Sequence, residues 1–308
     1  MSDNIPVRKK QRMSFGTFIK TYGSDYAFAA PFFILFLIFT VLPVLASVVI
    51  SFTNFNVVQF PDFVGFKNYF NLILDDSLFI TALKNTFLLS VVTGPLGYLL
   101  SLMVAWLVNE LGDRTRSVIT LIFYGPCISG GAYTVFQILY SGDTYGFLNG
   151  LLLSIGIIDS PIQWLTDTDY MMPAAMFLIL WMSFGTGFLS LIAGFKNVDK
   201  SMYEAAAVDG IKNRYQELWY VTLPSMKPQL MFSAVMSITG AFGVGPVITA
   251  VFGFPTSNYG LHTLIHHMED YGNTRFEMGY ASTIAVILFI LMVTCNTIIQ
   301  RILRKVGE

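Results

Sequence analysis

The sequence predicts an all-α membrane protein with six transmembrane helices. Three observations predict this class. Of the 308 residues, 54% are hydrophobic and 12% are charged, whereas soluble domains carry about 25% charged residues. Uncharged runs long enough to cross a bilayer as a helix recur six times along the chain. Barrel strands would alternate apolar and polar residues with a period of two, and the sequence has no such alternation.

The six helices are expected where the uncharged runs are most apolar. They are predicted near residues 26–52, 86–108, 118–140, 172–195, 230–251 and 278–300. The first run follows a basic segment, as in a signal peptide, but it is longer than the apolar core of a signal. We therefore expect an uncleaved first helix, a basic tail at residues 1–25 and one membrane domain at residues 26–305.

The distribution of basic residues predicts the orientation. With a cytoplasmic N-terminus, fifteen of the 18 Lys and Arg residues lie on the cytoplasmic side, as the positive-inside rule requires. Five are in the tail and five in the loop at 196–229, whereas Lys67, Lys84 and Arg275 lie outside. Both termini are therefore expected in the cytoplasm.

Several classes of protein are excluded by what the sequence lacks. It contains no G-x-x-x-x-G-K-[ST] phosphate loop, so we expect no ATP site in this chain. The net charge of −1 argues against nucleic-acid binding, and the two cysteines offer no disulfide framework. The six predicted helices hold no Asp, Glu, Lys, Arg or His, which argues against an ion-coupled carrier or a haem protein. No catalytic residue is expected.

The predicted helices are rich in glycine, proline and neutral polar residues. Close packing of helices through small residues is one interpretation, and locally broken helices around a polar pathway are another. In the second case, six side chains would line the pathway: Tyr133, Gln137, Trp181, Ser183, Thr186 and Thr239. Aromatic faces beside neutral hydrogen-bonding groups suit an uncharged polyhydroxyl solute. Each of these side chains could equally serve packing alone.

The loop at 196–229 is predicted to form two short helices at the cytoplasmic surface. Ser201–Glu204 has the pattern of a capping box that begins the first helix, and Gly210 would end it in a left-handed turn. Asn213–Gln216 can cap the second helix, and Pro224 is expected to stop it. The alanines of the first helix leave room for a close protein partner.

This loop resembles the EAA loop of the membrane subunits of binding-protein-dependent ABC importers. The resemblance rests on Glu204-Ala205-Ala206, on Gly210 six residues after the glutamate, and on the closing Leu223-Pro224. Further matches point to the carbohydrate-uptake branch, specifically to subunits similar to the maltose-type F permease. These matches are Phe63–Tyr69, Ala82–Thr86, Gly146–Asn149, Trp181–Leu189 and Met278–Ser282. The resemblance covers residues 26–305.

The resemblance implies a type I ABC importer permease fold in the bacterial plasma membrane. It implies a subunit that moves a mono- or oligosaccharide by alternating access. Its partners would be a second homologous permease subunit, two ATPase subunits and an extracellular solute-binding protein. No cofactor is expected in this chain, because ATP and magnesium would sit in the ATPase. The residues that would couple to the ATPase are Glu204, Ala205, Ala206, Asp209, Gly210, Leu223 and Pro224.

Two departures from the pattern leave alternatives open. The stretch from Gly210 to Leu223-Pro224 is one residue longer than usual, which could shift the second helix in register. The Gly-Gly-Pro that this branch carries after the fifth helix is replaced by Gly243-Val-Gly-Pro246, so the class of sugar stays open. A permease of the same fold for a non-sugar solute is one alternative. An ion-coupled carrier or a membrane scaffold without transport is another.

One histidine cluster stands apart from these motifs. His262 and His266 have the i, i+4 spacing of two metal ligands, with His267 and Glu269 nearby. A surface helix at the membrane interface is the alternative, and it is the one we expect. No metal site is predicted.

Overall fold

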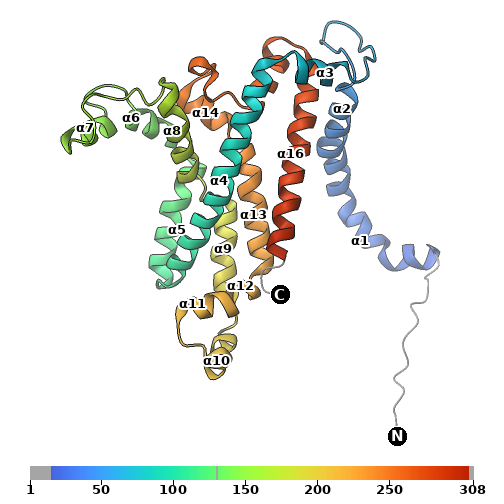
Figure 1. Ribbon diagram of the computed structural model, residues 1–308. Helices are drawn as coiled ribbons and strands as arrows, with labels where there is room; N and C mark the ends of the chain where they lie inside the picture. Colours follow the sequence, from blue (N-terminus) through green and yellow to red (C-terminus); the bar gives the residue numbers. More distant parts are fainter. Residues whose placement is uncertain (1–14, 130, 305–308) are drawn as a thin grey trace.

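The structure, a computed structural model, describes residues 15–129 and 131–304. Within those ranges the chain is helical apart from loops and a single β-bridge between Thr53 and Phe63. Figure 1 shows long helices running side by side, with α10 (Lys200–Val208) and α11 (Arg214–Glu217) projecting beyond them. We call the end of the bundle that carries α10 and α11 the inner end and the opposite end the outer end.

Four helical runs in the described ranges are long and apolar enough to cross a membrane, and two bent helix pairs pass the same test together. The four runs are Gly23–Ile50, Ser77–Asn109, Thr168–Asn197 and Met278–Leu303; the bent pairs are Asp113–Ile128 with Ala132–Leu139 and Lys227–Phe242 with Gly245–Phe252. The pairs are bent by 82° and 48°. Each sequence-predicted segment therefore falls on a helical run, but the third and fifth are bent rather than straight.

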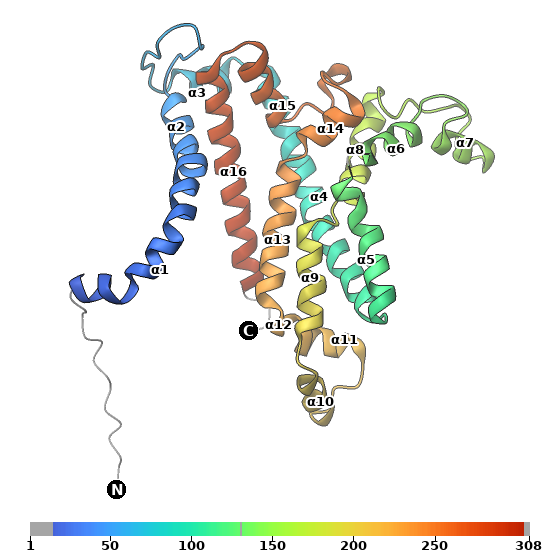
Figure 2. The ribbon, with the colours of Figure 1, turned by 180° about the vertical axis from the view of Figure 1, so that it is seen from behind.

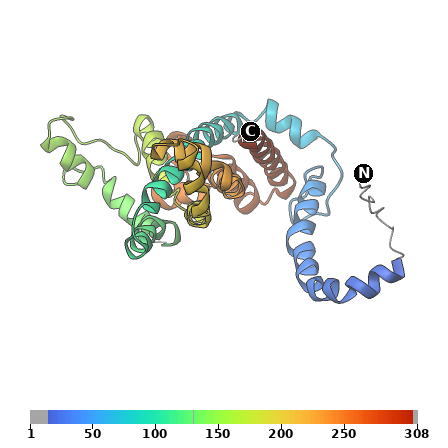
Figure 3. The ribbon, with the colours of Figure 1, turned by 90° about the horizontal axis from the view of Figure 1, so that it is seen from below.

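The first run stands apart from the other helices. It consists of α1 (Phe15–Phe36), a π-helical turn, η1 (Leu37–Val41), and α2 (Leu42–Ile50). None of its most apolar 18-residue window is buried. Its main contact with the rest of the molecule is between α2 and α16 (Met278–Arg304). Figure 2 shows α1 diverging from the bundle toward the inner end, and the view from below in Figure 3 shows the gap between its ribbon and the other helices.

The centre of the bundle is α4 (Ser77–Asn109), packed against α9 (Thr186–Asn197) and α13 (Lys227–Phe242). Helix α4 begins nine residues before the predicted start at 86, because the Asp76 carboxylate caps it by accepting a hydrogen bond from the Phe79 amide (3.0 Å). Glycine permits close approach here: a Cβ on Gly187 would lie 3.0 Å from Ser233 Oγ. Part of the small-residue content therefore serves packing.

Breaks in the helices coincide with glycines and prolines. Helix α8 (Thr168–Trp181) is separated from α9 by a break at 182–185, and α13 from α14 (Gly245–Phe252) by a break at 243–244. Helices α5 (Asp113–Ile128) and α6 (Ala132–Leu139) make the sharpest bend. Of the two interpretations of the glycine-rich helices, local breaks are found at 182–185 and 243–244, alongside close packing at Gly187.

Short helices lie at both ends of the bundle. They are α3 (Lys67–Leu74), α7 (Phe147–Ser154), η3 (Ser257–Tyr259), α15 (Leu264–Glu269) and η4 (Asp270–Thr274) at the outer end, and η2 (Leu218–Thr222) and α12 (Leu223–Ser225), which follow α11, at the inner end. We call residues 257–277 the outer segment; it connects α14 to α16.

Candidate functional site

The first helix of the 196–229 loop begins differently from the sequence prediction. The capping residue is Asp199, whose carboxylate accepts a hydrogen bond from the Ser201 amide at 2.9 Å. Hydrogen bonds from the backbone and the side chain of Ser201 lower the pKa of Asp199. The expected capping box of Ser201 and Glu204 is therefore wrong, because an aspartate two residues earlier takes the capping position. Glu204 is left exposed, with no capping role.

Gly210 ends that helix as predicted. Its φ is +94°, in the left-handed region that side chains disfavour. The Ile211 amide donates to the Ala206 carbonyl (3.0 Å) and the Gly210 amide to the Ala207 carbonyl (3.3 Å). This is the Schellman pattern, which satisfies the last carbonyls of a helix. The Asp209 side chain, at the C-cap, has no partner in the described part of the chain.

The second helix begins as predicted but does not end at Pro224. Asn213 Oδ1 accepts from the Gln216 amide (2.8 Å), and Gln216 Oε1 accepts from the Lys212 amide (3.0 Å). The helix then widens into the π-helical turn η2, and the Leu223 amide bonds back to the Leu218 carbonyl. Helical conformation continues through Pro224 to Ser225. The wider turn accommodates a residue that lacks an N–H, so the expected stop is wrong.

The loop presents an apolar surface with acidic groups to the solvent. Glu204, Ala205 and Asp209 are exposed, whereas Ala206 and Leu223 are buried against the chain itself and Pro224 is half-buried. The loop also exposes large apolar side chains: Met202, Val208, Tyr215, Trp219 and Tyr220. Exposed apolar side chains in this number are typical of a surface that contacts another protein or lipid.

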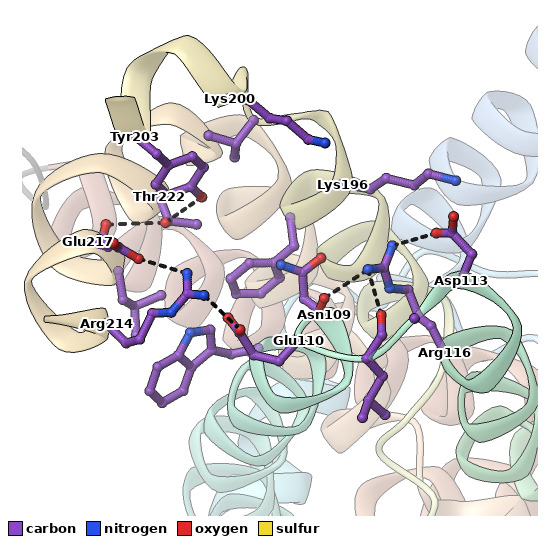
Figure 4. Close-up of a pocket in the computed structure, with 16 residues that line it drawn as sticks. Asn109, Glu110, Asp113, Arg116, Lys196, Lys200, Tyr203, Arg214, Glu217 and Thr222 are labelled. Atoms are coloured by element: carbon purple, nitrogen blue, oxygen red, sulfur yellow. Dashed lines mark hydrogen bonds and ion pairs between the residues drawn. The ribbon is translucent and has the colours of Figure 1, made fainter. Parts of the chain in front are cut away.

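The loop is fixed to the inner end of α4. Figure 4 shows Arg214 between Glu217 of its own helix (2.9 Å) and Glu110 at the end of α4 (3.3 Å). These carboxylates raise the pKa of Arg214. The Tyr215 ring lies 5.5 Å from that of Trp106 on α4. Between loop and helix is a cavity of about 630 Å³. The loop is thus attached to α4 as well as to its flanking helices.

A second cavity, of about 350 Å³, lies among the broken helices. Three of the six proposed pathway residues line it, namely Tyr133, Ser183 and Thr186. Its other polar or glycine lining residues are Thr93, Cys127, Gly185, Gly187, Ser237, Gly240 and Gly243. The side chains of Tyr133 and Thr186 make no hydrogen bond within the described residues, so their hydroxyls are available to a solute.

The other three proposed pathway residues lie elsewhere. Gln137 donates to the Ala250 carbonyl at 2.8 Å and thereby joins α6 to α14. Thr239 accepts from the Asn296 side chain at 3.4 Å. The Trp181 ring is half-exposed beside Phe136, with the ring centroids 6.4 Å apart. Sequence reasoning missed Thr93 and Ser237, although Ser237 lies three residues before Gly240 and therefore on the same side of the helix.

The histidines are not on a surface helix. His262, His266 and His267 are at most 2% exposed and lie at the outer end among α4, α14 and α16. The predicted surface helix is therefore wrong, because the rings are buried and hydrogen-bonded: His267 to Asp76, His266 to the Gly245 carbonyl, and His262 to His267. In the described ranges no group of His, Cys, Asp and Glu is arranged to hold a metal ion.

The chain belongs to the family described as "Binding-protein-dependent transport system inner membrane component", whose model matches residues 24–306. It is 33% identical over 275 residues to the probable ABC transporter permease protein YesP of Bacillus subtilis, covering 87% of this chain and 86% of that one. It is 30% identical to the lactose transport system permease protein LacF of Rhizobium radiobacter, covering 90% and 92%. The resemblance noted in the sequence is thereby confirmed.

The fold is shared with solved structures. A bacterial ABC transporter involved in the import of the acidic polysaccharide alginate contains a chain that matches with a TM-score of 0.74 at 22% identity, covering 95% of this chain and 99% of that one. The same transporter in complex with an alginate pentasaccharide-bound periplasmic protein gives a TM-score of 0.76. This likeness establishes the ABC importer permease fold.

Proposed function

We propose that this chain is a permease subunit of an ATP-driven bacterial importer for a sugar. The observation that carries the proposal is the exposed, acidic and apolar surface of the 196–229 loop, attached to the helix that lines the cavity. A surface of this kind suits a soluble partner that pushes or pulls on the loop. An ATPase is the partner that the family implies.

The solute would pass through the cavity of about 350 Å³. Its lining combines hydroxyls with an aromatic ring and carries no ionised side chain. Such a lining favours an uncharged polyhydroxyl compound over an ion. Relatives named for lactose and arabinooligosaccharide transport support a sugar, and most directly an oligosaccharide.

The proposed topology has six spans, with the bent pairs counted as one span each. Helix α16 ends at the same end as α10 and α11, and that end carries the basic loop. We place this inner end in the cytoplasm of a bacterial plasma membrane, and with it both termini. The first span would then pack on lipid and on a second, homologous permease subunit.

Coupling would follow from this arrangement. Two ATPase subunits would hydrolyse ATP and move the loops of the two permeases, and an extracellular solute-binding protein would deliver the sugar to the outer end. Movement of the loop would reach α4 directly through Arg214 and Tyr215. This chain would then supply the path and the coupling surface, while ATP and magnesium stay in the partner.

Reconstitution of the complex tests the function. The chain is assembled in proteoliposomes with the permease, ATPase and binding protein encoded beside it, and uptake of labelled lactose and arabinooligosaccharides is measured. We expect uptake that needs ATP inside and binding protein outside and that persists when ionophores collapse ion gradients. Uptake driven by an ion gradient without the ATPase would contradict the proposal. If the complex took up only a non-sugar solute in an ATP-dependent way, the proposed importer function would stand and the proposed sugar substrate would be wrong.

Cysteine labelling tests the topology. Single cysteines replace Lys212 and Asp167 in a chain that lacks Cys127 and Cys295. We expect an impermeant maleimide to label position 167 in intact cells and position 212 only after the membrane is opened. Labelling of both positions in intact cells would overturn the orientation.

A further inference from the structure

A carboxylate at the outer end joins four helical elements. Asp76 Oδ1 accepts from the Phe79 amide at 3.0 Å. Asp76 Oδ2 accepts from His267 Nε2 (3.0 Å), from the Tyr271 hydroxyl (3.2 Å) and from the Tyr280 hydroxyl (3.1 Å). The donors belong to α4, α15, η4 and α16. Only an ionised carboxylate accepts from all of them, and charge-assisted bonds of this kind are strong.

The protonation of His266 is fixed by its neighbours. The Thr263 amide, which can only donate, lies 3.2 Å from His266 Nδ1. The Gly245 carbonyl, which can only accept, lies 3.1 Å from His266 Nε2. Nδ1 of His266 must therefore be unprotonated, and Nε2 must carry the proton. A second proton on this ring would face the Thr263 N–H.

His267 and His262 form a chain that ends at Asp76. His267 Nε2 must carry a proton, because it faces the carboxylate. His267 Nδ1 lies 3.2 Å from His262 Nε2, and one proton is shared across this contact. His262 Nδ1 is buried and has no partner. If His267 took a second proton, His262 would have to turn its own proton to Nδ1, where nothing accepts it. The stable arrangement therefore has neutral rings with protons on Nε2.

Two more side chains of α4 hold the same segment. Asn85 Nδ2 donates to the Gly260 carbonyl (3.1 Å) and the His262 carbonyl (3.0 Å). The Thr86 hydroxyl accepts from the Leu264 amide at 2.8 Å. Asn85 is 7% exposed and Thr86 is 2% exposed. Because α4 also lines the cavity through Thr93, the outer segment and the cavity share one helix.

We propose that Asp76, His267 and Tyr280 are positioning residues for import, which hold the outer segment to α4 and α16 while all three histidines stay neutral with the proton on Nε2. The proposal rests on the proposed function, since the outer segment would then face the solute-binding protein. Docking there would be passed to α4 and so to the cavity. The charged groups around the network are Asp270 and Arg275, which pair at 2.7 Å, Glu277, and, on the side of α3, Lys67 and Asp75.

The histidines report on the anchor directly, because the chain has only three. The full chain, purified with a tag that contains no histidine, is labelled with ¹⁵N-histidine and placed in lipid nanodiscs. We expect nitrogen shifts of neutral Nε2–H rings for all three, unchanged between about pH 5.5 and 8, where free histidine titrates. A ring with its proton on Nδ1, or an imidazolium at pH 7, would overturn the assignment. This measurement does not depend on transport.

Variants test the positioning role. Asp76→Asn replaces one of the two acceptor oxygens with an NH₂ group, so the side chain no longer accepts from all four donors, whereas Asp75→Asn, the matched control, changes an exposed carboxylate beside it. We expect Asp76→Asn to lower ATP-dependent uptake at least about tenfold, since unpaired buried donors weaken the anchor. Amide hydrogen exchange should accelerate within residues 257–277 and stay unchanged in the 196–229 loop. Tyr280→Phe, which removes one donor, should give a smaller effect in the same direction.

The outcomes separate this proposal from the proposed function. Wild-type uptake in Asp76→Asn, with wild-type insertion, would overturn the positioning role. Faster exchange in every part of the chain would also overturn it, because the carboxylate would then serve general stability. If the unaltered complex imports no sugar but the nitrogen shifts are those of three neutral Nε2–H rings, the proposed function is wrong, while the hydrogen-bond network around Asp76 is still supported.

Discussion

Arg214 and Glu110 join the 196–229 loop to the end of α4, with the guanidinium and the carboxylate 3.3 Å apart. The pair is largely exposed, so it contributes at most about 1 kcal/mol. The pair matters for its location rather than for its stability, because α4 runs from this contact past the cavity to Asp76 at the outer end. The loop therefore has a direct contact with a helix to which it is not adjacent in sequence.

Charge exchange tests that contact. We expect Glu110→Arg alone to lower sugar uptake per ATP hydrolysed by up to about fivefold, because like charges then face each other. The double variant Glu110→Arg with Arg214→Glu should recover most of the loss. Coupling is measured as the ratio of uptake to hydrolysis in proteoliposomes. Failure of the exchange to restore the ratio would remove the contact from the coupling path.

Glu204 and Asp199 should separate coupling from folding. Glu204 is exposed and has no capping role, so Glu204→Gln should leave α10 intact yet remove a charge that we expect to pair with the ATPase. Loss of one partner of a desolvated pair costs about 2–5 kcal/mol, enough to release the ATPase. Asp199→Ala should instead destabilise α10 by about 1 kcal/mol through loss of the cap. Co-purification of the ATPase and exchange of α10 amides measure the two effects. Firm ATPase binding in Glu204→Gln would contradict the docking role.

Gly210→Val should strain the turn between the two helices of the loop. A left-handed backbone costs side-chain residues roughly 1–2 kcal/mol, and a β-branched residue is disfavoured further. We expect normal insertion, weaker ATPase binding and loss of uptake. Gly112→Ala is the matched control, since Gly112 lies at the inner end with open space around it and a negative φ. Equal behaviour of the two variants would show that the turn geometry does not matter for coupling.

Thr186→Val should weaken solute binding in the cavity. The substitution keeps the shape of the side chain and removes a hydroxyl that has no protein partner. Loss of one hydrogen bond to the solute costs about 1 kcal/mol, or roughly a fivefold rise in the KM of uptake. Thr120→Val removes another unpartnered hydroxyl, outside the cavity, and should leave the KM unchanged. Similar KM values in both variants would remove Thr186 from the pathway.

Acid should weaken the outer segment. Burial, with His267 and His266 nearby, lowers the pKa of His262 to about 4. Burial also lowers the pKa of His266 and, against the pull of Asp76, that of His267. A released histidine titrates near 6.5, so the stability that the neutral ring provides is lost as the pH falls below that value. At pH 5 the cost for His262 is about 2 kcal/mol.

Protonation of Asp76 at low pH should also weaken the outer segment. Burial would raise its pKa, but the Phe79 amide, His267 and Tyr280 outweigh burial and lower it. Its contribution is therefore also lost as the pH falls through the lowered value. We expect hydrogen exchange in residues 257–277 to rise between pH 6.5 and 4 before the 196–229 loop responds. Exchange that is independent of pH over this range, after correction for intrinsic rates, would contradict the tautomers assigned above.

Hydropathy predicted where the helices lie but not how they bend. The breaks at 182–185 and 243–244 arise where glycine, serine or proline interrupts an apolar run, and the same residues suit close packing, so composition alone does not separate the two. The most apolar part of the second run predicts a start at 86, just after Lys84, whereas the cap at Asp76 begins the helix at Ser77. Local capping chemistry extended the helix beyond its membrane-length core.

The site was predictable where it is local in sequence. The turn at Gly210 and the cap at Asn213 follow from neighbouring residues, and both were confirmed. The anchor of Asp76 to His267 joins residues far apart in the chain, and no spacing rule brings them together. The stop predicted at Pro224 was wrong because a π-helical turn precedes it, and local sequence does not predict that turn, whose Val221 and Thr222 are buried. At Asp76 and Pro224, contacts with residues distant in sequence determine the local structure more than the intrinsic propensity of the residue does.

The contact of α2 with α16 has a consequence for synthesis. Of the membrane helices described in this chain, the first to be synthesised has its main native neighbour within the chain in the last one. Until residues 278–304 are made, that apolar helix has lipid on nearly every side and can drift from the growing bundle. Closure of the domain is therefore a late event, and a chain truncated before α16 should leave its first helix unattached.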